Sequence, residues 1–277
     1  MPYRILAIDL DNTFLDSLGN VTETNLSALH AAEAAGCRVV ICTARGRLST
    51  LPVWEELQPI SGPHIVFNGS TTYENLHREP TEVLLMDPAV LSRRFAEAEP
   101  DGIGVMAYED PRAGDRVYVA QPTPPLAAWV DMYPDRSVCV DSIADALSRD
   151  HVAVLGWGSE EQLAGLADRL GDCDGFTAPR VAPALQHDSW LLELTAHGAT
   201  KGAALDRVAS SLGVSPDEVI GMGDAPADIS MLEYAGLGVA VENARGSVKS
   251  VADYIAPSAD DGGIAHVVER FVLNDPA

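Results

Sequence analysis

Two aspartates near the N-terminus are the residues of this chain best suited to chemistry. Ile5 to Leu10 form a short apolar run of the kind that is buried in a parallel sheet, and Asp9 and Asp11 stand at its carboxyl end. Ligands of open α/β sheets bind outside the carboxyl ends of strands. Two like charges this close are costly unless a cation or a shared proton relieves them, so the pair suggests a divalent metal. The same segment could instead be only a strand-to-loop turn.

Thr43 directly follows a second apolar run at residues 38–42. A hydroxyl at the carboxyl end of a strand, followed by small residues that open a helix, can bind a phosphoryl oxygen beside backbone N–H groups. The alternative is a simple helix N-cap, a position in which threonine is common.

Lys201 opens a predicted helix in a chain whose other lysine is Lys249. A compact ammonium at this point would neutralise a phosphoryl group and relieve the crowded aspartates. The alternative is a solvated residue at the start of a helix, although a cation in the first turn opposes the helix dipole.

A third apolar run, at residues 219–222, leads into Gly223 and Asp224, and Asp228 follows four residues later. At the carboxyl end of a strand, these two carboxylates would face the same crevice as Asp9 and Asp11. Together they would make an oxygen-rich site suited to Mg²⁺. Alternatively, Asp228 could cap the helix that is expected to begin at Ile229.

The elements that must position these residues alternate between strand and helix at both ends of the chain. The predicted strands are residues 5–9, 38–42, 64–67, 219–222, 237–241 and 254–256. Predicted helices lie at 22–35, from about 47 to 57, and at 201–212, 229–235, 247–252 and 263–271. This alternation predicts right-handed βαβ units, and hence an α/β fold with a Rossmann-like, doubly wound parallel sheet.

The pattern changes between residues 81 and 190. Strand patterns lie there at 83–86, 103–107, 116–120 and 152–156, and helical patterns at 88–99, 126–133 and 160–170. Turns rich in proline and glycine separate them. We therefore expect residues 81–190 to form an inserted α+β cap domain, and residues 1–80 and 191–277 to form the core domain. One continuous α/β domain is the alternative.

Composition excludes several classes of protein. The chain has 277 residues, 47% of them hydrophobic, and a formal net charge of −23, which argues against nucleic-acid and anionic-membrane partners. Four scattered cysteines (37, 42, 139 and 173) are expected to be reduced thiols. The N-terminus has no pattern of a leader, and no apolar stretch is long enough to span a bilayer. We expect a cytoplasmic protein, as a monomer or a homodimer.

The order of these motifs resembles that of the haloacid dehalogenase superfamily, and in particular its Cof-like phosphatases. Four features of that family have counterparts here. Asp9–Thr13 matches the motif Asp-x-Asp-x-Thr, and Thr43 matches a threonine after the second strand. Lys201 matches a lysine that opens a later helix, and Gly223–Asp228 matches Gly-Asp-x-x-x-Asp. The chain departs from the family at Asn12, where glycine is usual, at Ala227, where asparagine is usual, and at Pro226.

The resemblance implies a Mg²⁺-dependent phosphomonoester hydrolase. Asp9 would be the nucleophile that forms an aspartyl-phosphate, and Asp11 would be the general acid and base. The metal would be held by the carboxylates of Asp9 and Asp224 and by the backbone carbonyl of Asp11, with Asp228 binding directly or through water. Ala227 cannot orient the neighbouring carboxylate or a metal-bound water by hydrogen bonding, as an asparagine at this position can.

The resemblance also implies how a substrate would be held. Thr43 and Lys201 would bind the phosphoryl oxygens, assisted by N–H groups near Asn12 and Ala44. Arg45 would face the substrate, unless it forms a surface salt bridge, and cap residues around His187 and Asp188 would select the leaving group. The expected partner is a small phosphorylated metabolite, by default a sugar phosphate. Two other functions stay open: a sugar phosphomutase, and a non-catalytic ligand-binding protein that retains the fold.

Overall fold

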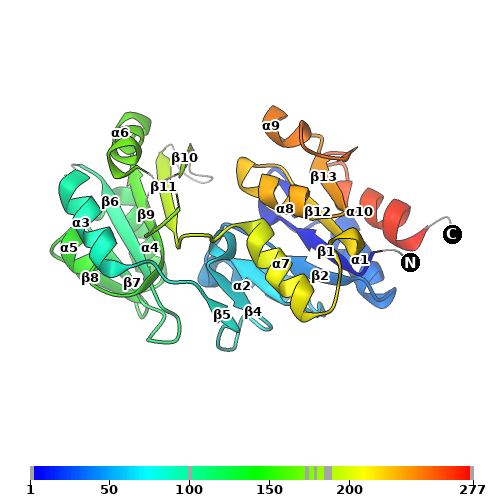
Figure 1. Cartoon of the computed structure of the whole chain (residues 1–277), viewed down its shortest axis with the longest axis horizontal. Helices are drawn as coiled ribbons and strands as arrows, with labels where there is room; N and C mark the ends of the chain where they lie inside the picture. Colours follow the sequence, from blue (N-terminus) through cyan, green and yellow to red (C-terminus); the bar gives the residue numbers. More distant parts are fainter. Residues whose placement is uncertain (1–2, 99–101, 172–174, 178–179, 184–188, 275–277) are drawn as a thin grey trace. The chain divides into compact units, whose positions relative to one another are not determined.

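The chain folds into two compact units, Met1–Glu82 with Thr200–Ala277, and Val83–Ala199 (Figure 1). The computed structural model describes residues 3–98, 102–171, 175–177, 180–183 and 189–274. The second unit ends at Ala199, whereas the sequence placed the return to the core at residue 191. Residues 191–195 belong to the strand β11 (Trp190–Thr195), which pairs with β9 (His151–Gly158) inside the second unit.

The first unit is built on a parallel sheet of five strands. Its order is β14-β13-β12-β1-β2, with bounds β14 (Tyr254–Ala256), β13 (Leu237–Val241), β12 (Val219–Gly223), β1 (Ile5–Ile8) and β2 (Arg38–Ile41). Every neighbouring pair is parallel. All four residues of β1 are buried, because apolar side chains on a central strand are covered from both faces.

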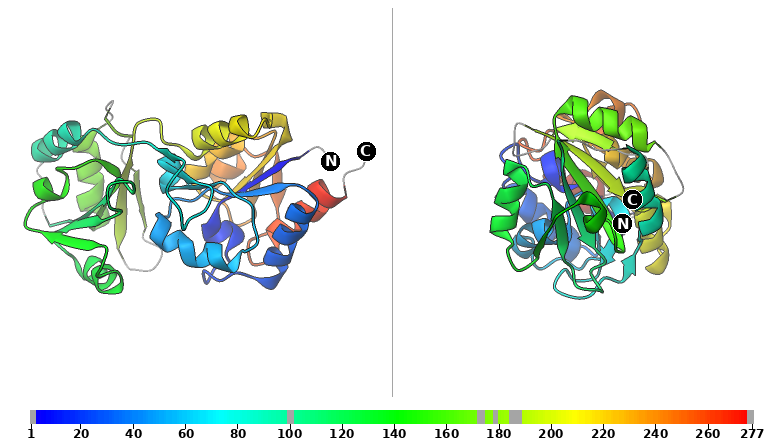
Figure 2. Two further views of the ribbon diagram at one scale, coloured as in Figure 1. Left: turned by 90° about the horizontal axis from the view of Figure 1, so that it is seen from below. Right: turned by 90° about the vertical axis from the view of Figure 1, so that its left-hand side faces the viewer.

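Helices cover both faces of this sheet, which confirms the Rossmann-like, doubly wound fold. Figure 2 shows α7 (Lys201–Ser211) and α8 (Ile229–Tyr234) on one face, and α1 (Glu23–Ala34) and α10 (Gly263–Val267) on the other. The Thr22 side chain accepts a hydrogen bond from the Asn25 N–H and caps α1, as the sequence predicts. Two further α-helices, α2 (Arg47–Glu56) and α9 (Gly246–Lys249), belong to this unit, and α10 continues into the π-helical segment Val268–Leu273.

A small sheet adjoins β2 in the same unit. It contains β3 (His64–Val66), β4 (Thr71–Tyr73) and β5 (Glu82–Val83), and β3 and β4 run antiparallel. A parallel bridge between Cys42 and Ile65 connects it to the end of β2. The sequence predicted β3 but not β4, although both strands are three residues long.

The second unit combines helices with a six-stranded sheet, whose order is β10-β11-β9-β6-β7-β8. The strands not yet given are β6 (Gly104–Glu109), β7 (Val117–Ala120), β8 (Ser137–Val140) and β10 (Arg180–Pro183). The helices are α3 (Pro88–Ala98), α4 (Pro124–Met132), α5 (Ile143–Ala146) and α6 (Glu160–Leu170). All strand pairs are antiparallel except β7 with β8.

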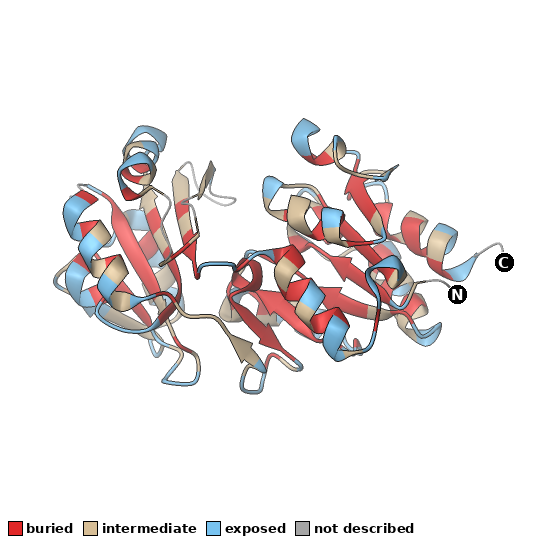
Figure 3. Ribbon diagram, viewed as in Figure 1, coloured by how far each residue is buried: buried red, intermediate tan, exposed pale blue. Residues whose placement is uncertain are grey.

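Each face of the second sheet has its own apolar cluster. The larger one includes Val105, Val154 and Leu192, together with buried side chains of α3, α5 and α6. The smaller one joins Met106 to Leu126 of α4 on the opposite face, because successive residues of a strand point to opposite sides. Figure 3 shows buried strands in both units, each with its own core.

Cys37, Cys42 and Cys139 are free thiols in the structure, and Cys173 lies outside the described residues. In the part of the chain that the structure describes, no helix combines the length and the apolar content needed to cross a bilayer.

Candidate active site

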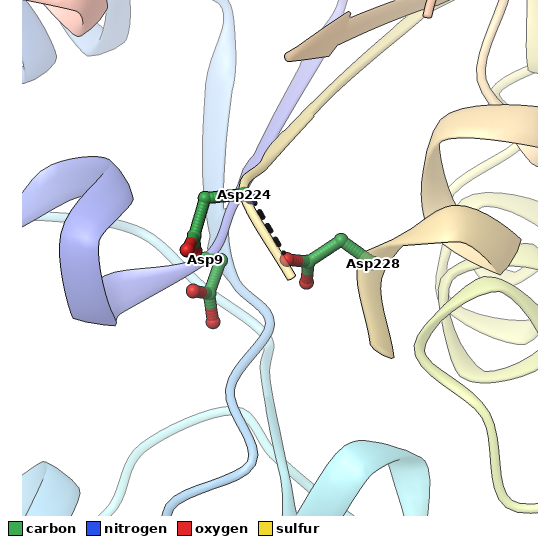
Figure 4. Close-up of side chains that lie close together, drawn as sticks. All are labelled: Asp9, Asp224 and Asp228. Carbon is green, nitrogen blue, oxygen red and sulfur yellow. Dashed lines mark hydrogen bonds between the residues drawn. The ribbon is translucent and has the colours of Figure 1, made fainter. Parts of the chain in front are cut away.

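The carboxyl ends of β1 and β12 bring Asp9 and Asp224 together. Ile8 pairs with Met222 in the sheet, and the Asp9 N–H donates to the Met222 carbonyl at 3.0 Å. Figure 4 shows the carboxylates of Asp9, Asp224 and Asp228 facing one another. One ligand oxygen from each lies within 4.8 Å of the others.

Asp228 braces the loop that carries Asp224. Its Oδ2 accepts the Asp224 N–H at 3.0 Å, drawn as a dashed line in Figure 4, and the Ala225 N–H at 2.9 Å. The side chain does not cap α8. Gly223 is needed here, because a Cβ at that position would lie 2.3 Å from the Asp228 Cβ. Pro226 suits the first position of the turn Pro226–Asp228, where its fixed φ is favourable.

Lys201 lies between two of these carboxylates. Its Nζ is 2.6 Å from Asp9 Oδ1 and 2.5 Å from Asp228 Oδ1, and its side chain is only 2% exposed. The helix that carries it is packed closely on α8, since a Cβ at Gly202 would lie 2.0 Å from the Ser230 carbonyl oxygen. The alternative of a solvated residue at the start of a helix is therefore wrong.

The charges of this cluster do not balance, because three carboxylates face one ammonium. Burial, together with Asp228 and Asp224, raises the pKa of Asp9 well above its ordinary value despite Lys201. Burial and then Asp228 raise the pKa of Asp224 to about 6. Burial opposes the charge on Lys201, but Asp228 and Asp9 hold its pKa above the ordinary value. A buried, all-oxygen donor set with excess negative charge is chemically suited to a hard divalent cation.

Thr43 is fully buried at the carboxyl end of β2, the other neighbour of β1. Its N–H donates to the Ile65 carbonyl at 2.9 Å, and its Oγ1 accepts the Arg45 N–H at 3.1 Å. Gly46, and not Thr43, is the N-cap of α2, so Thr43 does not have the simple capping role.

Asp11 is not part of the three-carboxylate cluster. Its carboxylate is paired with Arg45, with Nε 2.9 Å from Oδ2 and the second guanidinium nitrogen, Nη2, 2.5 Å from Oδ1. Arg45, which the sequence predicted to face the substrate, therefore contacts Asp11, the proposed general acid and base. That Asp11 is a metal ligand through its backbone carbonyl stays a prediction.

Two polar residues of this region, Thr13 and Asn243, have no role in the predictions from the sequence. Thr13 Oγ1 donates to Asp224 Oδ1 at 3.2 Å, and the third position of Asp-x-Asp-x-Thr was the available signal. Asn243 Nδ2 donates to the Asn12 carbonyl at 2.7 Å. Asn12 has a φ of 56°, in the left-handed region that asparagine tolerates better than most residues, which explains how it replaces the usual glycine.

The remaining predictions concern residues that would bind the substrate. That the N–H groups of Asn12 and Ala44 donate hydrogen bonds to the phosphoryl group stays a prediction. His187 and Asp188 lie outside the described residues.

The chain is similar to known proteins over nearly its whole length. Residues 6–268 match a family model described as haloacid dehalogenase-like hydrolase. The chain is 29% identical to "Phosphatase YwpJ" of Bacillus subtilis (strain 168), over 97% of this chain and 100% of that protein. A haloacid dehalogenase-like hydrolase from Bacteroides thetaiotaomicron has a similar structure, with a TM-score of 0.81, 22% identity, and 97% and 99% of the two chains covered. A HAD subclass IIB sugar phosphatase gives a TM-score of 0.79, 23% identity, and coverage of 97% and 98%.

Proposed function

We propose a role for each residue of this site from the premise that the chain belongs to the haloacid dehalogenase-like hydrolase family, whose model covers residues 6–268. It is a phosphatase of that family. The proposed reaction is Mg²⁺-dependent hydrolysis of a phosphomonoester through an aspartyl-phosphate. The observation that carries the proposal is the buried Asp9 carboxylate, in contact with Lys201 and close to Asp224 and Asp228.

Asp9 is the proposed nucleophile. Its carboxylate attacks phosphorus and displaces the alcohol, which divides one difficult displacement into two easier ones. Asp11 donates a proton to the leaving oxygen in the first step. In the second step it accepts a proton from the water that attacks the aspartyl-phosphate, so that phosphate is released and both aspartates are regenerated.

Asp9, Asp224 and Asp228 are the proposed Mg²⁺ ligands, with the backbone carbonyl of Asp11 as a further one. Thr13 orients Asp224 by its hydrogen bond to Oδ1. When bound, the cation supplies positive charge, which allows an anionic nucleophile to approach an anionic phosphoryl group. The excess of carboxylates over ammonium in the cluster supports this assignment.

Lys201 and Thr43 are the proposed ligands of the phosphoryl oxygens, assisted by the N–H groups of Asn12 and Ala44. Lys201 suits this role because its ammonium already contacts the nucleophile, so a phosphoryl group bound to Asp9 would lie next to it. Thr43 suits it because its strand neighbours β1 and its hydroxyl is held at the strand end.

A small phosphorylated metabolite is the proposed substrate, and a sugar phosphate is the first choice because one structural neighbour is a sugar phosphatase. A cytoplasmic location and a monomeric or homodimeric state remain predictions. The phosphomutase alternative is tested with a hexose 1-phosphate and a bisphosphate activator. Formation of the isomeric hexose phosphate instead of free phosphate would overturn hydrolysis as the reaction.

The assignment of Asp9 is tested with p-nitrophenyl phosphate and Mg²⁺. We expect Asp9→Asn to abolish hydrolysis, because an amide is not a nucleophile at phosphorus, whereas Asp131→Asn, an exposed aspartate of α4, keeps the wild-type rate. Removal of the metal with EDTA should stop the reaction, and Mg²⁺ should restore it. Equal rates for the wild type and Asp9→Asn would rule out the proposed nucleophile.

A further inference from the structure

The guanidinium of Arg45 and the carboxylate of Asp11 meet at two points. Nε is 2.9 Å from Oδ2, and Nη2 is 2.5 Å from Oδ1. The third nitrogen, Nη1, donates to the Ser49 carbonyl at 3.3 Å. Both side chains are mostly covered, with 20% and 22% of their surfaces exposed. This is the planar, two-point geometry for which arginine is better suited than lysine.

The backbone of Arg45 is also held in place. Its N–H donates to Thr43 Oγ1 at 3.1 Å, and its carbonyl accepts the Phe67 N–H at 3.0 Å. The next residue, Gly46, lies against the Phe67 ring, where a Cβ would come within 2.4 Å of the ring. The side chain of Arg45 therefore starts from a fixed point on the loop after β2, and its guanidinium ends on Asp11.

From these contacts we propose that Arg45 is a positioning residue, which orients the carboxyl group of Asp11 for proton transfer instead of binding the phosphoryl group. This inference rests on the proposed phosphatase reaction, in which Asp11 is the acid and base.

Two-point pairing stops the Asp11 carboxyl group from rotating about its Cβ–Cγ bond. Each carboxylate oxygen has more than one lone-pair direction, so an oxygen that accepts from Arg45 can still exchange a proton with a leaving group or with water. A phosphoryl group would have to displace Asp11 to reach Nε and Nη2, which already have partners. The geometry thus favours a role through Asp11 over direct contact with the phosphoryl group.

The test uses two substrates of similar shape, p-nitrophenyl phosphate and phenyl phosphate. The p-nitrophenolate ion leaves without a proton, whereas the more basic phenolate depends on a general acid. We expect Arg45→Ala to lower kcat on phenyl phosphate at least about tenfold more than on p-nitrophenyl phosphate, with KM changed little, because general acid–base catalysis is worth roughly 10²–10⁴. Both rates are measured on one enzyme sample, so a partly unfolded variant changes neither their ratio nor the conclusion.

Two further variants sharpen this test. Arg45→Lys keeps the charge but not the two-point pairing, and should fall between the wild type and Arg45→Ala. Arg112→Ala is the matched control, since Arg112 pairs with Asp110 through Nε and Nη2 in the second unit and should leave the ratio of the two rates unchanged.

Combination with Asp11→Asn decides whether Arg45 acts through Asp11. If it does, adding Arg45→Ala to Asp11→Asn causes no further loss on phenyl phosphate, because residues that act as a unit are not additive. Two outcomes would overturn the role of Arg45 and leave the proposed function standing. In the first, Arg45→Ala lowers kcat equally on both substrates and raises KM. In the second, Arg45→Ala lowers kcat on phenyl phosphate as much in the Asp11→Asn background as in the wild type. Equal rates for the wild type and Asp9→Asn would overturn the proposed function, and this inference with it.

Discussion

At the scale of single residues, the buried ammonium of Lys201 stabilises Asp9 and Asp228, whose carboxylates it contacts. Both carboxylates are almost completely buried, and each is within 2.6 Å of Nζ. A buried charge without a partner costs several kcal/mol, so the ammonium stabilises the cluster, and it is also the proposed ligand of the phosphoryl group. Lys201 therefore links stability to the proposed chemistry.

We predict that Lys201→Met lowers both stability and activity. Removing one partner of a buried ion pair costs about 3–5 kcal/mol, and loss of the proposed phosphoryl ligand should lower kcat/KM at least about 10²-fold. Urea unfolding and hydrolysis of p-nitrophenyl phosphate measure the two effects.

The other lysine is the control. Lys249 pairs with Glu242 at 3.2 Å near the surface, with 26% of its side chain exposed, so Lys249→Met should cost less than about 1 kcal/mol and leave hydrolysis unchanged. Equal losses in the two variants would show that Lys201 has no special place in the cluster.

At the scale of elements, a buried histidine joins α2 to β3. Trp54 of α2 donates its indole N–H to Nε2 of His64 on β3 at 2.8 Å, and His64 is fully buried. Burial lowers the pKa of His64 from an ordinary 6.5 to about 3, because the imidazolium loses its hydration. Protonation of Nε2 would also break the hydrogen bond from Trp54. The contact between these elements therefore depends on a neutral imidazole.

We predict that His64 makes the protein less stable as the pH falls from about 6.5 towards 3. In this window the unfolded chain binds a proton at His64 that the folded chain does not. The contribution of neutral His64 to the free energy of unfolding is therefore fully present above pH 6.5. This contribution decreases by about 1.4 kcal/mol for each pH unit below that value. Urea unfolding at pH 8, 6 and 5 measures the slope, which should be smaller in His64→Gln.

His197 provides the control for this slope. It is exposed and lies on the segment between β11 and α7, and His197→Gln should keep the wild-type dependence on pH. A His64→Gln variant with the wild-type slope would show that other groups cause the loss of stability in acid.

At the scale of the whole molecule, the two units have separate cores and different connectivity. The second unit is one continuous segment, Val83–Ala199, with its own sheet and two apolar clusters. The first unit is assembled from two distant segments, because β12, β13 and β14 come from the C-terminal part of the chain. Every proposed catalytic residue lies in the first unit.

We predict that a fragment of residues 83–199 folds by itself and does not hydrolyse p-nitrophenyl phosphate. It keeps every strand of its six-stranded sheet, whereas a fragment of residues 1–82 loses three of the five strands of the parallel sheet. Circular dichroism during heating should show a cooperative transition for the first fragment and none for the second. A fragment of residues 83–199 without a cooperative transition would mean that its core needs the rest of the chain.

Much of the site was predictable because it stands at the ends of strongly apolar strands. The runs before Asp9, Thr43 and Asp224 are short and continuous, and parallel pairing places their carboxyl ends at one edge of a sheet. The strands β8, β10 and β11 were missed, and with them the correct end of the second unit. β8 and β10 have only four residues each, and β11, although largely apolar, is assigned to the second sheet by its pairing with β9.

The order of apolar runs and polar strand ends was enough to predict the parallel α/β sheet, the inserted unit and the meeting of Asp9, Asp224 and Asp228 at one edge of the sheet, whereas the catalytic roles of these residues stay predictions. Periodicity and spacing are local properties, and they can be read along a chain. Only the folded chain decided that Lys201 bridges Asp9 and Asp228, that Thr13 donates to Asp224, and that Arg45 pairs with Asp11. These contacts join side chains between 27 and 211 positions apart in the sequence, and their directions depend on how helices and loops pack on the sheet.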